Sequence, residues 1–175
     1  MRIKLCVLCL MFCSSPLMAD QNKLFIGGAL GFWSYDEQDS SGFSPISLEG
    51  VVDYEVLENL DLRLNVGVGI SEETNISPVG DETTFQIDSY AGVYIKPKLT
   101  IDNITLYPLI GYSTTALDAT FNDRKLSSNS SGLLYGAGVS YNFSKMKRIT
   151  VEWRQQADTA NYELSGFTIG LMVAM

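Results

Sequence analysis

Hydrophobic and polar residues alternate along most of this chain, and the stretch 60–70 shows the pattern in its simplest form. There, L-D-L-R-L-N-V-G-V-G-I places an aliphatic side chain at every even position and a polar residue or glycine at every odd one. Successive side chains of a β-strand point to opposite faces, so this segment is predicted to be a strand with one apolar and one polar face. The alternation by itself leaves open which face meets the interior.

Seven further segments repeat this period of two, four of them strictly and three more loosely: 45–57, 85–98, 133–143, 148–156, 23–35, 104–115 and 162–175. The pattern therefore predicts eight strands and no helix. In the first strand the phase stays open, because two sets of residues are equally plausible as its outer face. These sets are Leu24, Ile26, Leu30 and Phe32, or Phe25, Ala29, Trp33 and Tyr35.

The connections between these strands alternate strictly between long and short. In chain order they are 36–44, 57–59, 71–83, 102–103, 116–131, 144–146 and 157–161. In an antiparallel up-and-down meander, this alternation places every short turn at one end and every long loop at the other. Pro108 lies in the fifth strand and has no backbone N–H, so we expect a bulge or a local break in the pairing there.

Two architectures fit eight such strands: a soluble barrel or sandwich with an apolar interior, and a membrane barrel with an apolar exterior. The polar face carries charges of both signs: Glu49, Asp53, Glu55, Asp61, Arg63, Asp88, Lys96, Glu152 and Arg154. A solvated exterior would carry such charges, and so would a narrow lumen in which they pair with one another. Most strands also have room for the roughly 9–11 residues that a tilted strand needs to cross the hydrocarbon layer.

Glycines and aromatic residues favour the membrane barrel. Five glycines lie on the polar face, where side chains converge inside a tight barrel: Gly67, Gly69, Gly92, Gly136 and Gly138. Aromatic residues on the apolar face lie near the strand ends. Tyr54, Tyr141 and Phe143 lie towards the short turns, and Phe85, Tyr112, Trp153 and Phe167 towards the long loops. Two such girdles match the two interfaces of a bilayer, so we predict that the nine charged residues form a lumen charge network.

Residues 1–19 have the features of a secretory signal peptide. Arg2 and Lys4 precede a short apolar run, and Ala19 ends a segment that suits cleavage. A lipoprotein signal is the alternative, but bulky residues precede Cys13. All three cysteines lie within this segment, so we expect neither a disulfide nor thiol chemistry in the barrel domain, residues 20–175. Loss of Arg2 and Lys4 leaves 10 basic and 20 acidic residues, a net charge of −10, which argues against nucleic acid as a partner.

The end of the chain carries a further signature, T-I-G-L-M-V-A-M over residues 168–175. With this segment and the strand pattern, essentially the whole mature chain resembles the OmpA/OmpX-type eight-stranded outer-membrane barrels of Gram-negative bacteria. The resemblance implies that Thr168, Gly170, Val173 and Met175 belong to an assembly signal read by the barrel-assembly machinery after periplasmic chaperones have carried the chain. Met175 departs from the family, in which an aromatic residue is typical at this position.

The sequence offers no catalytic constellation. It contains no histidine, which excludes Ser-His-Asp triads and other histidine-dependent mechanisms. No phosphate-binding loop or dinucleotide fingerprint is present, and Gly27, Gly28 and Gly31 are better explained by packing within a strand. Carboxylate pairs such as Asp53 and Glu55 are better explained by a lumen charge network than by glycosidase chemistry. We therefore expect a non-enzymatic protein without cofactor or bound metal.

These observations predict an all-β, eight-stranded antiparallel up-and-down transmembrane β-barrel, integral to the outer membrane, monomeric, with a lumen plugged by charged residues. We expect a structural or interaction role in envelope integrity, adhesion or binding through the loops. The long loops are acidic, which suits divalent-cation bridging to lipopolysaccharide or contact with an external partner. Two alternatives stay open: a narrow non-specific pore gated by the lumen charges, and a soluble periplasmic lipocalin-like binder with its apolar faces turned inward.

Overall fold

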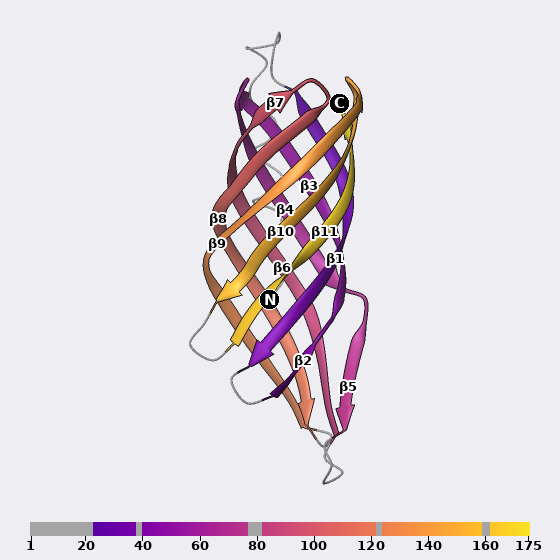
Figure 1. The fold of residues 1–175 in the computed structure, drawn as a ribbon. Helices are drawn as coiled ribbons and strands as arrows, with labels where there is room; N and C mark the ends of the chain where they lie inside the picture. Colours follow the sequence, from indigo (N-terminus) through magenta and orange to yellow (C-terminus); the bar gives the residue numbers. More distant parts are fainter. Residues whose placement is uncertain (1–22, 38–39, 77–81, 122–123, 159–161) are drawn as a thin grey trace, which may run out of the picture.

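Eight long antiparallel strands close into a barrel in the computed structural model (Figure 1). The structure describes residues 23–37, 40–76, 82–121, 124–158 and 162–175. The barrel strands are β1 (Leu24–Glu37), β3 (Ile46–Leu57), β4 (Leu60–Gly69), β6 (Glu82–Pro97), β8 (Ile104–Phe121), β9 (Arg124–Ser144), β10 (Lys147–Asp158) and β11 (Tyr162–Ala174). Each pairs with the next along the chain, and β1 pairs with β11 to close the ring. The predicted fold class is therefore confirmed.

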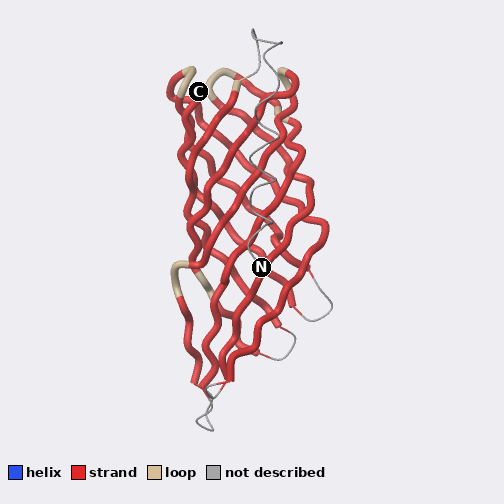
Figure 2. Tube along the Cα trace, turned by 180° about the vertical axis from the view of Figure 1, so that it is seen from behind, coloured by secondary structure: helices blue, strands red, loops and turns tan. Residues whose placement is uncertain are grey.

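Three short strands add to this ring: β2 (Ser40–Phe43) pairs with β1, β5 (Glu72–Ile76) with β6, and β7 (Leu99–Ile101) with β8. None of the described residues forms a helix, as Figure 2 shows from behind. No membrane-spanning helix is therefore found in the part of the chain that the structure describes. The predicted signal peptide, residues 1–19, lies outside the described residues.

The short turns gather at one end of the barrel and the long connections at the other (Figure 1). The turns lie between β3 and β4, between β7 and β8, and between β9 and β10. Asp102 adopts φ 54°, the positive φ that a tight hairpin turn requires. The two ends of the barrel chain also meet here, because the backbone N–H of Met175 donates to the carbonyl oxygen of Leu24 at 2.8 Å.

The apolar face of the strands points outward. In β4, Leu62, Leu64, Val66 and Val68 are 38–64% exposed, whereas Asp61, Arg63 and Asn65 are buried in the lumen. The structure also decides the phase of β1. Ile26, Leu30 and Phe32 face outward, and Phe25, Ala29, Trp33 and Tyr35 are buried inside. The exposed apolar belt is what a strand in lipid presents.

One predicted strand changes phase halfway. The pairing of β6 with β8 shifts register between Ile87 and Ser89, so Asp88 occupies a β-bulge. One extra residue reverses the alternation, and the first part of β6 therefore faces the opposite way from the sequence prediction. Phe85 is buried inside, not part of an outer girdle, and Asp88 is exposed, not part of the lumen charge network. Both predictions were wrong for this one reason.

The other predicted girdle residues lie on the outer surface. Tyr54, Tyr141 and Phe143 are 41–49% exposed near the short turns. Tyr112 and Phe167 are more than half exposed nearer the long-loop end, and Trp153, partly exposed, packs against Tyr135 with ring centroids 6.0 Å apart. Aromatic residues thus mark both ends of the apolar belt, where a bilayer has its interfaces.

Strand β8 runs through Pro108 without interruption. Its register with β9 is continuous from Tyr107 to Leu109. On the other side, pairing stops at Ile95 of β6 and resumes at Leu99 of β7, so the gap between these two strands lies opposite Pro108. The expected break is therefore a gap between β6 and β7, the strands that pair with β8 on that side, and β8 itself is continuous.

Aromatic and aliphatic side chains fill the long-loop half of the lumen. We call this the aromatic cluster; it consists of Trp33, Tyr35, Phe43, Phe85, Ile87, Tyr90, Leu117 and Leu164. Glycine makes room for it: a Cβ on Gly67 would collide with the ring of Tyr90 on the neighbouring strand. Gly138 makes room in the same way for the ring of Tyr107. Gly67 and Gly138 are thus sites where a bulky lumen side chain crosses a strand.

Candidate functional site: the charged lumen

The structure brings most of the predicted charges together inside the barrel. Seven are at most 2% exposed: Glu49, Asp53, Asp61, Arg63, Lys96, Glu152 and Arg154. Glu55 is partly exposed at the short-turn end, and Asp88 lies outside. The strands supply these residues at inward positions from β3, β4, β6 and β10. Eight of the nine predicted charges therefore lie in the lumen network, Glu55 at its short-turn end, because a strand without a bulge keeps its phase.

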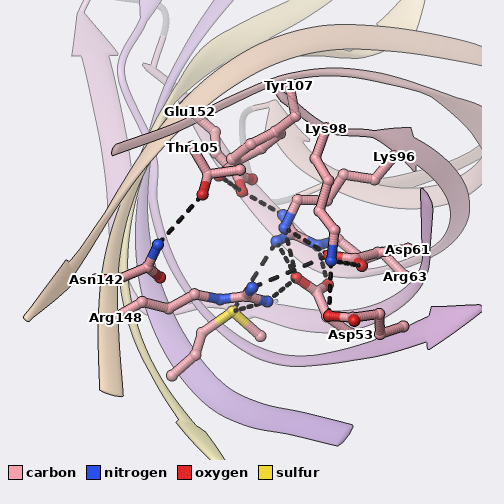
Figure 3. Close-up of polar contacts among 12 residues, drawn as sticks. Asp53, Asp61, Arg63, Lys96, Lys98, Thr105, Tyr107, Asn142, Arg148 and Glu152 are labelled. Carbon is pink, nitrogen blue, oxygen red and sulfur yellow. Dashed lines mark hydrogen bonds and ion pairs between the residues drawn. The ribbon is translucent and has the colours of Figure 1, made fainter. Parts of the chain in front are cut away.

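Asp53 is the centre of this network (Figure 3). Its carboxylate accepts hydrogen bonds from Arg63 at 2.5 and 2.9 Å, from Lys96 at 2.6 Å and from Arg148. Asp53 and Arg63 are directly opposed on β3 and β4, so the strand register itself creates the first of these pairs. Three cations from three other strands therefore converge on one carboxylate.

Glu152 forms the next contact towards the long loops. It accepts hydrogen bonds from Arg63 and, at 2.7 Å, from the hydroxyl of Tyr107. The ring of Tyr107 also lies beneath Lys96, whose Nζ is 4.1 Å from the ring centroid. Such cation–π contacts stabilise a buried ammonium group in addition to its ion pairs.

A second group of polar side chains surrounds Glu49. Its carboxylate accepts hydrogen bonds from Arg154 at 2.7 Å, from Asn65 at 3.0 Å and from Tyr90 at 3.0 Å. Trp33 donates at 2.8 Å to Ser47, whose hydroxyl lies 2.9 Å from that of Tyr90. This chain of contacts joins the charged residues to the aromatic cluster.

At the short-turn end the network finishes with Lys98. Its ammonium group contacts Asp61 at 2.6 Å and Glu55 at 2.8 Å. Lys98 and Arg148 were absent from the nine predicted residues, although both lie at inward positions within the predicted segments 85–98 and 148–156. The alternation that identified Lys96 and Glu152 was sufficient to find them. The lumen tyrosines were harder to identify, because tyrosine is equally common on a lipid-facing surface.

Among the described residues, five cations thus face five carboxylates in the lumen. The cations are Arg63, Lys96, Lys98, Arg148 and Arg154, and the carboxylates are Glu49, Asp53, Glu55, Asp61 and Glu152. The charges of this set are balanced and closely paired, as buried charges need to be. The arrangement contains no group of three or more potential metal ligands among the described side chains.

The residues of the predicted assembly signal lie along the last strand, β11. Thr168 and Gly170 face the lumen and are buried, whereas Val173 faces outward and is 38% exposed. Met175 follows the strand and is 83% exposed. The segment therefore presents apolar side chains to the outside at the very end of the barrel chain.

This geometry agrees with the family to which the sequence is similar. Residues 5–174 match the family described as outer membrane protein beta-barrel domain. The chain belongs to this outer-membrane barrel family. The resemblance to OmpA/OmpX-type barrels is therefore confirmed, and the outer-membrane barrel's charged interior is inconsistent with a lipocalin-like binder that turns its apolar faces inward.

Solved structures support the same fold. Ail, the attachment invasion locus protein of Yersinia pestis, solved in complex with the heparin analogue sucrose octasulfate, is 18% identical, with a TM-score of 0.61 over 88% of this chain and 97% of that chain. Neisserial surface protein A is 11% identical, with a TM-score of 0.66 over 88% and 99%. The N-terminal β-barrel domain of Pseudomonas aeruginosa OprF is 11% identical, with a TM-score of 0.58 over 89% and 100%. The search of curated protein sequences found none that is significantly similar to this chain.

Proposed function

We propose that this outer-membrane barrel is a non-enzymatic surface protein that binds an external partner through its long-loop end. The observation that carries the proposal is a sheet that extends beyond the rest of the rim. It consists of β5, β6, β8 and β9 and ends where Phe121 pairs with Arg124 (Figure 1). Long loops of such barrels face the exterior of the cell, so this sheet would stand above the membrane.

One edge of the extended sheet has free hydrogen-bonding groups. Strand β9 pairs with β10 only as far as Tyr135, which is opposite Gln155. Over residues 124–134, the described part of the chain supplies a partner for β9 on the β8 side alone. An unpaired strand edge is a template on which an extended polypeptide adds as a further strand. Leu126, 64% exposed on this strand, adds an apolar contact for such a partner.

The opposite edge of the extended sheet is better covered. The carboxylate of Glu73 accepts a hydrogen bond from the backbone N–H of Ser44 at 2.7 Å, and the hydroxyl of Ser71 accepts one from the backbone N–H of Ile46 at 2.7 Å. These contacts join residues 71–73, where β5 begins, to residues 44–46, where β3 begins. The β9 edge is therefore the more accessible of the two for strand addition.

The filled lumen favours binding over transport. Ion pairs occupy its middle, and the aromatic cluster occupies its long-loop half. Contact with lipopolysaccharide through the acidic loops is part of the same proposal, with divalent cations as bridges between carboxylates and phosphates. Ail was solved with a heparin analogue, but this chain has a net charge of −8, so we do not expect a polyanion as its partner.

The test is to shorten the β8–β9 hairpin without changing its register. Replacing residues 119–126 with Asn-Gly removes the tip and leaves Asp118 paired with Ser127, because Asn-Gly suits a two-residue hairpin turn. Bacteria that display this variant should lose adhesion to epithelial cells and survival in serum, and fall to the level of cells lacking the protein. The purified variant should keep the heat-modifiable gel migration of a folded barrel.

A matched control replaces Lys145 and Met146, in the turn between β9 and β10, with the same Asn-Gly dipeptide. This turn lies at the opposite end of the barrel, so adhesion and serum survival should be unchanged. If the shortened hairpin leaves both properties intact while the barrel folds, the extended sheet is not the binding element and the proposal fails.

A further inference from the structure

The lumen opens at the short-turn end into a cavity of about 810 Å³. We call this cavity the vestibule; its walls come from the start of β1, the end of β9 and the three short turns. Its inner limit is the ion-pair network at Arg148 and Lys98, beyond which the lumen is filled. In barrels of this family the short turns face the periplasm. A ligand of the vestibule would therefore enter from the periplasm.

The vestibule collects positive charge in an acidic protein. Four of the chain's 12 lysine and arginine residues line it, but only three of its 20 acidic residues do. The cations are Lys23, Lys98, Lys145 and Arg148, and the carboxylates are Glu55, Glu58 and Asp102. Since the whole chain carries a net charge of −8, a local excess of cations is a feature of this cavity and not of the composition.

Arg148 has a buried hydrogen-bond donor without an acceptor. Its residue is 4% exposed, and its guanidinium group lies 3.9 Å from the centroid of the Phe25 ring, which fixes its plane. Nη2 donates to Asp53, but Nε has no partner, and Nη1 is 4.0 Å from Asp61, beyond hydrogen-bond distance. A buried charged donor without an acceptor is unfavourable, so this group favours an additional anion.

Lys98 lies on the other side of the same space (Figure 3). Two of the three N–H donors of its ammonium group are taken by Glu55 and Asp61. Asn142 and Thr105 line the wall near Arg148 and bond to each other at 3.2 Å. Two nearly buried cations with spare donors thus face one cavity of a size typical of small-molecule sites.

We propose that the vestibule binds an anionic group, a carboxylate or a phosphate, that reaches it from the periplasm. Arg148 and Lys98 hold the anion by charge-assisted hydrogen bonds, and Lys23 and Lys145 attract it at the rim. The cavity is far larger than one such group, so the ligand is either a small anion-bearing molecule or the end of a longer anionic polymer. The same charge-assisted hydrogen bonds would hold either kind of ligand.

The test uses the mature chain refolded into detergent micelles and followed by nitrogen-15 NMR. Two probes separate the sources: inorganic phosphate, and soluble muropeptides with free carboxylates. A saturable shift of the backbone amides of Asn103, Asn142 and Ser144 with either probe is the expected result. Muropeptides with amidated carboxylates are the neutral control and should cause no saturable shift, because the anion is what the cavity recognises.

Lys98→Gln should raise the dissociation constant at least about tenfold, since it removes a charge-assisted hydrogen bond. Lys145→Gln, at the rim, tests long-range attraction with a smaller effect. Lys147→Gln is the matched control, because Lys147 is exposed next to Arg148 but does not line the vestibule. Retained heat-modifiable migration identifies variants that fold.

Three results would overturn the proposal. These are the absence of a saturable shift with both probes, equal binding of the amidated muropeptides, and equal weakening by Lys98→Gln and Lys147→Gln. Shifts that spread to the β8–β9 tip instead of remaining at the short-turn end would also contradict it, because they would report non-specific binding.

Discussion

Asp53 shows how a single side chain can organise the inside of a membrane barrel. It is fully buried and contacts Arg63, Lys96 and Arg148, which come from three different strands. In a low-dielectric interior, a paired carboxylate contributes mainly by compensating the cations around it. The stability of the lumen therefore depends on this one negative charge more than on any exposed acidic residue.

Asp53→Asn keeps the size of the side chain and removes the charge. We expect the free energy of unfolding to fall by about 3–5 kcal/mol, because three buried cations lose their common partner. Urea titration of protein folded into lipid vesicles measures this quantity. Asp88→Asn is the matched control: Asp88 is exposed, so the change should stay within about 0.5 kcal/mol. Equal effects of the two substitutions would show that the ion pairs do not stabilise the barrel.

The same two residues show what the sequence can predict at this scale. Asp53 was placed in the lumen correctly because β3 alternates without interruption around it. Asp88 also follows an aliphatic residue and falls on the polar face in the apparent phase of its segment, but it occupies a bulge. A bulge depends on how two strands fit side by side. The one local irregularity in residues 85–98 is Ser89, a polar residue at a position of the apolar face, and it does not by itself distinguish a bulge from an ordinary substitution.

At the scale of the strand, the sequence predicted existence and type better than length. The predicted segment 133–143 corresponds to β9, which runs from Arg124 to Ser144, and 104–115 corresponds to β8, which continues to Phe121. The missing parts extend beyond the apolar belt, where residues such as Ser127–Ser131 are polar on both faces. Alternation requires that one face meets lipid, so it disappears where both faces meet water.

Met175, which follows the last strand, offers a test of the predicted assembly signal. Met175 is exposed and its backbone N–H closes the barrel onto Leu24, so its side chain contributes little to the folded state. If residues 168–175 act as the assembly signal, Met175→Phe should speed insertion and leave the free energy of unfolding unchanged. The rate at which the heat-modifiable band appears in proteoliposomes that contain the assembly machinery measures the effect.

The matched control is Met146→Phe, which adds the same aromatic ring to an exposed methionine in a turn at the same end of the barrel. It should leave the insertion rate unchanged. A rate that is equal for Met175→Phe and the wild type would show that this chain does not depend on a terminal aromatic residue.

For the whole molecule, the lumen has three zones in series. The vestibule opens at the short-turn end, the ion pairs fill the middle, and the aromatic cluster fills the long-loop half. We expect each filled zone to oppose the passage of ions for a different reason. The ion pairs neutralise one another, and the aromatic cluster is too apolar to hydrate an ion. Opening a path would require both zones to rearrange together.

The purified protein in a planar lipid bilayer should therefore show no sustained conductance steps at neutral pH. A known open porin inserted into the same bilayer provides the positive control for the recording. Regular, long-lived steps from the wild-type protein would contradict a plugged lumen and would restore the narrow pore as the better account of its function.

The sequence by itself determined the class of this molecule. Period-two alternation, the strict exchange of short and long connections, and glycines on the polar face are local features that only a barrel in lipid satisfies together. The inward orientation of charges such as Arg63 and Glu152 could be predicted from their odd or even position in the strand, because a regular strand keeps its phase.

Only the tertiary structure decided the phase of β1, the bulge at Asp88, the partners of each charge and the extent of the projecting sheet. These features depend on strands that are distant along the chain. Arg63 meets Glu152 because closure of the ring brings β4 and β10 to opposite sides of one narrow lumen. A one-dimensional pattern states which way a side chain points, whereas the closed barrel decides what it meets there.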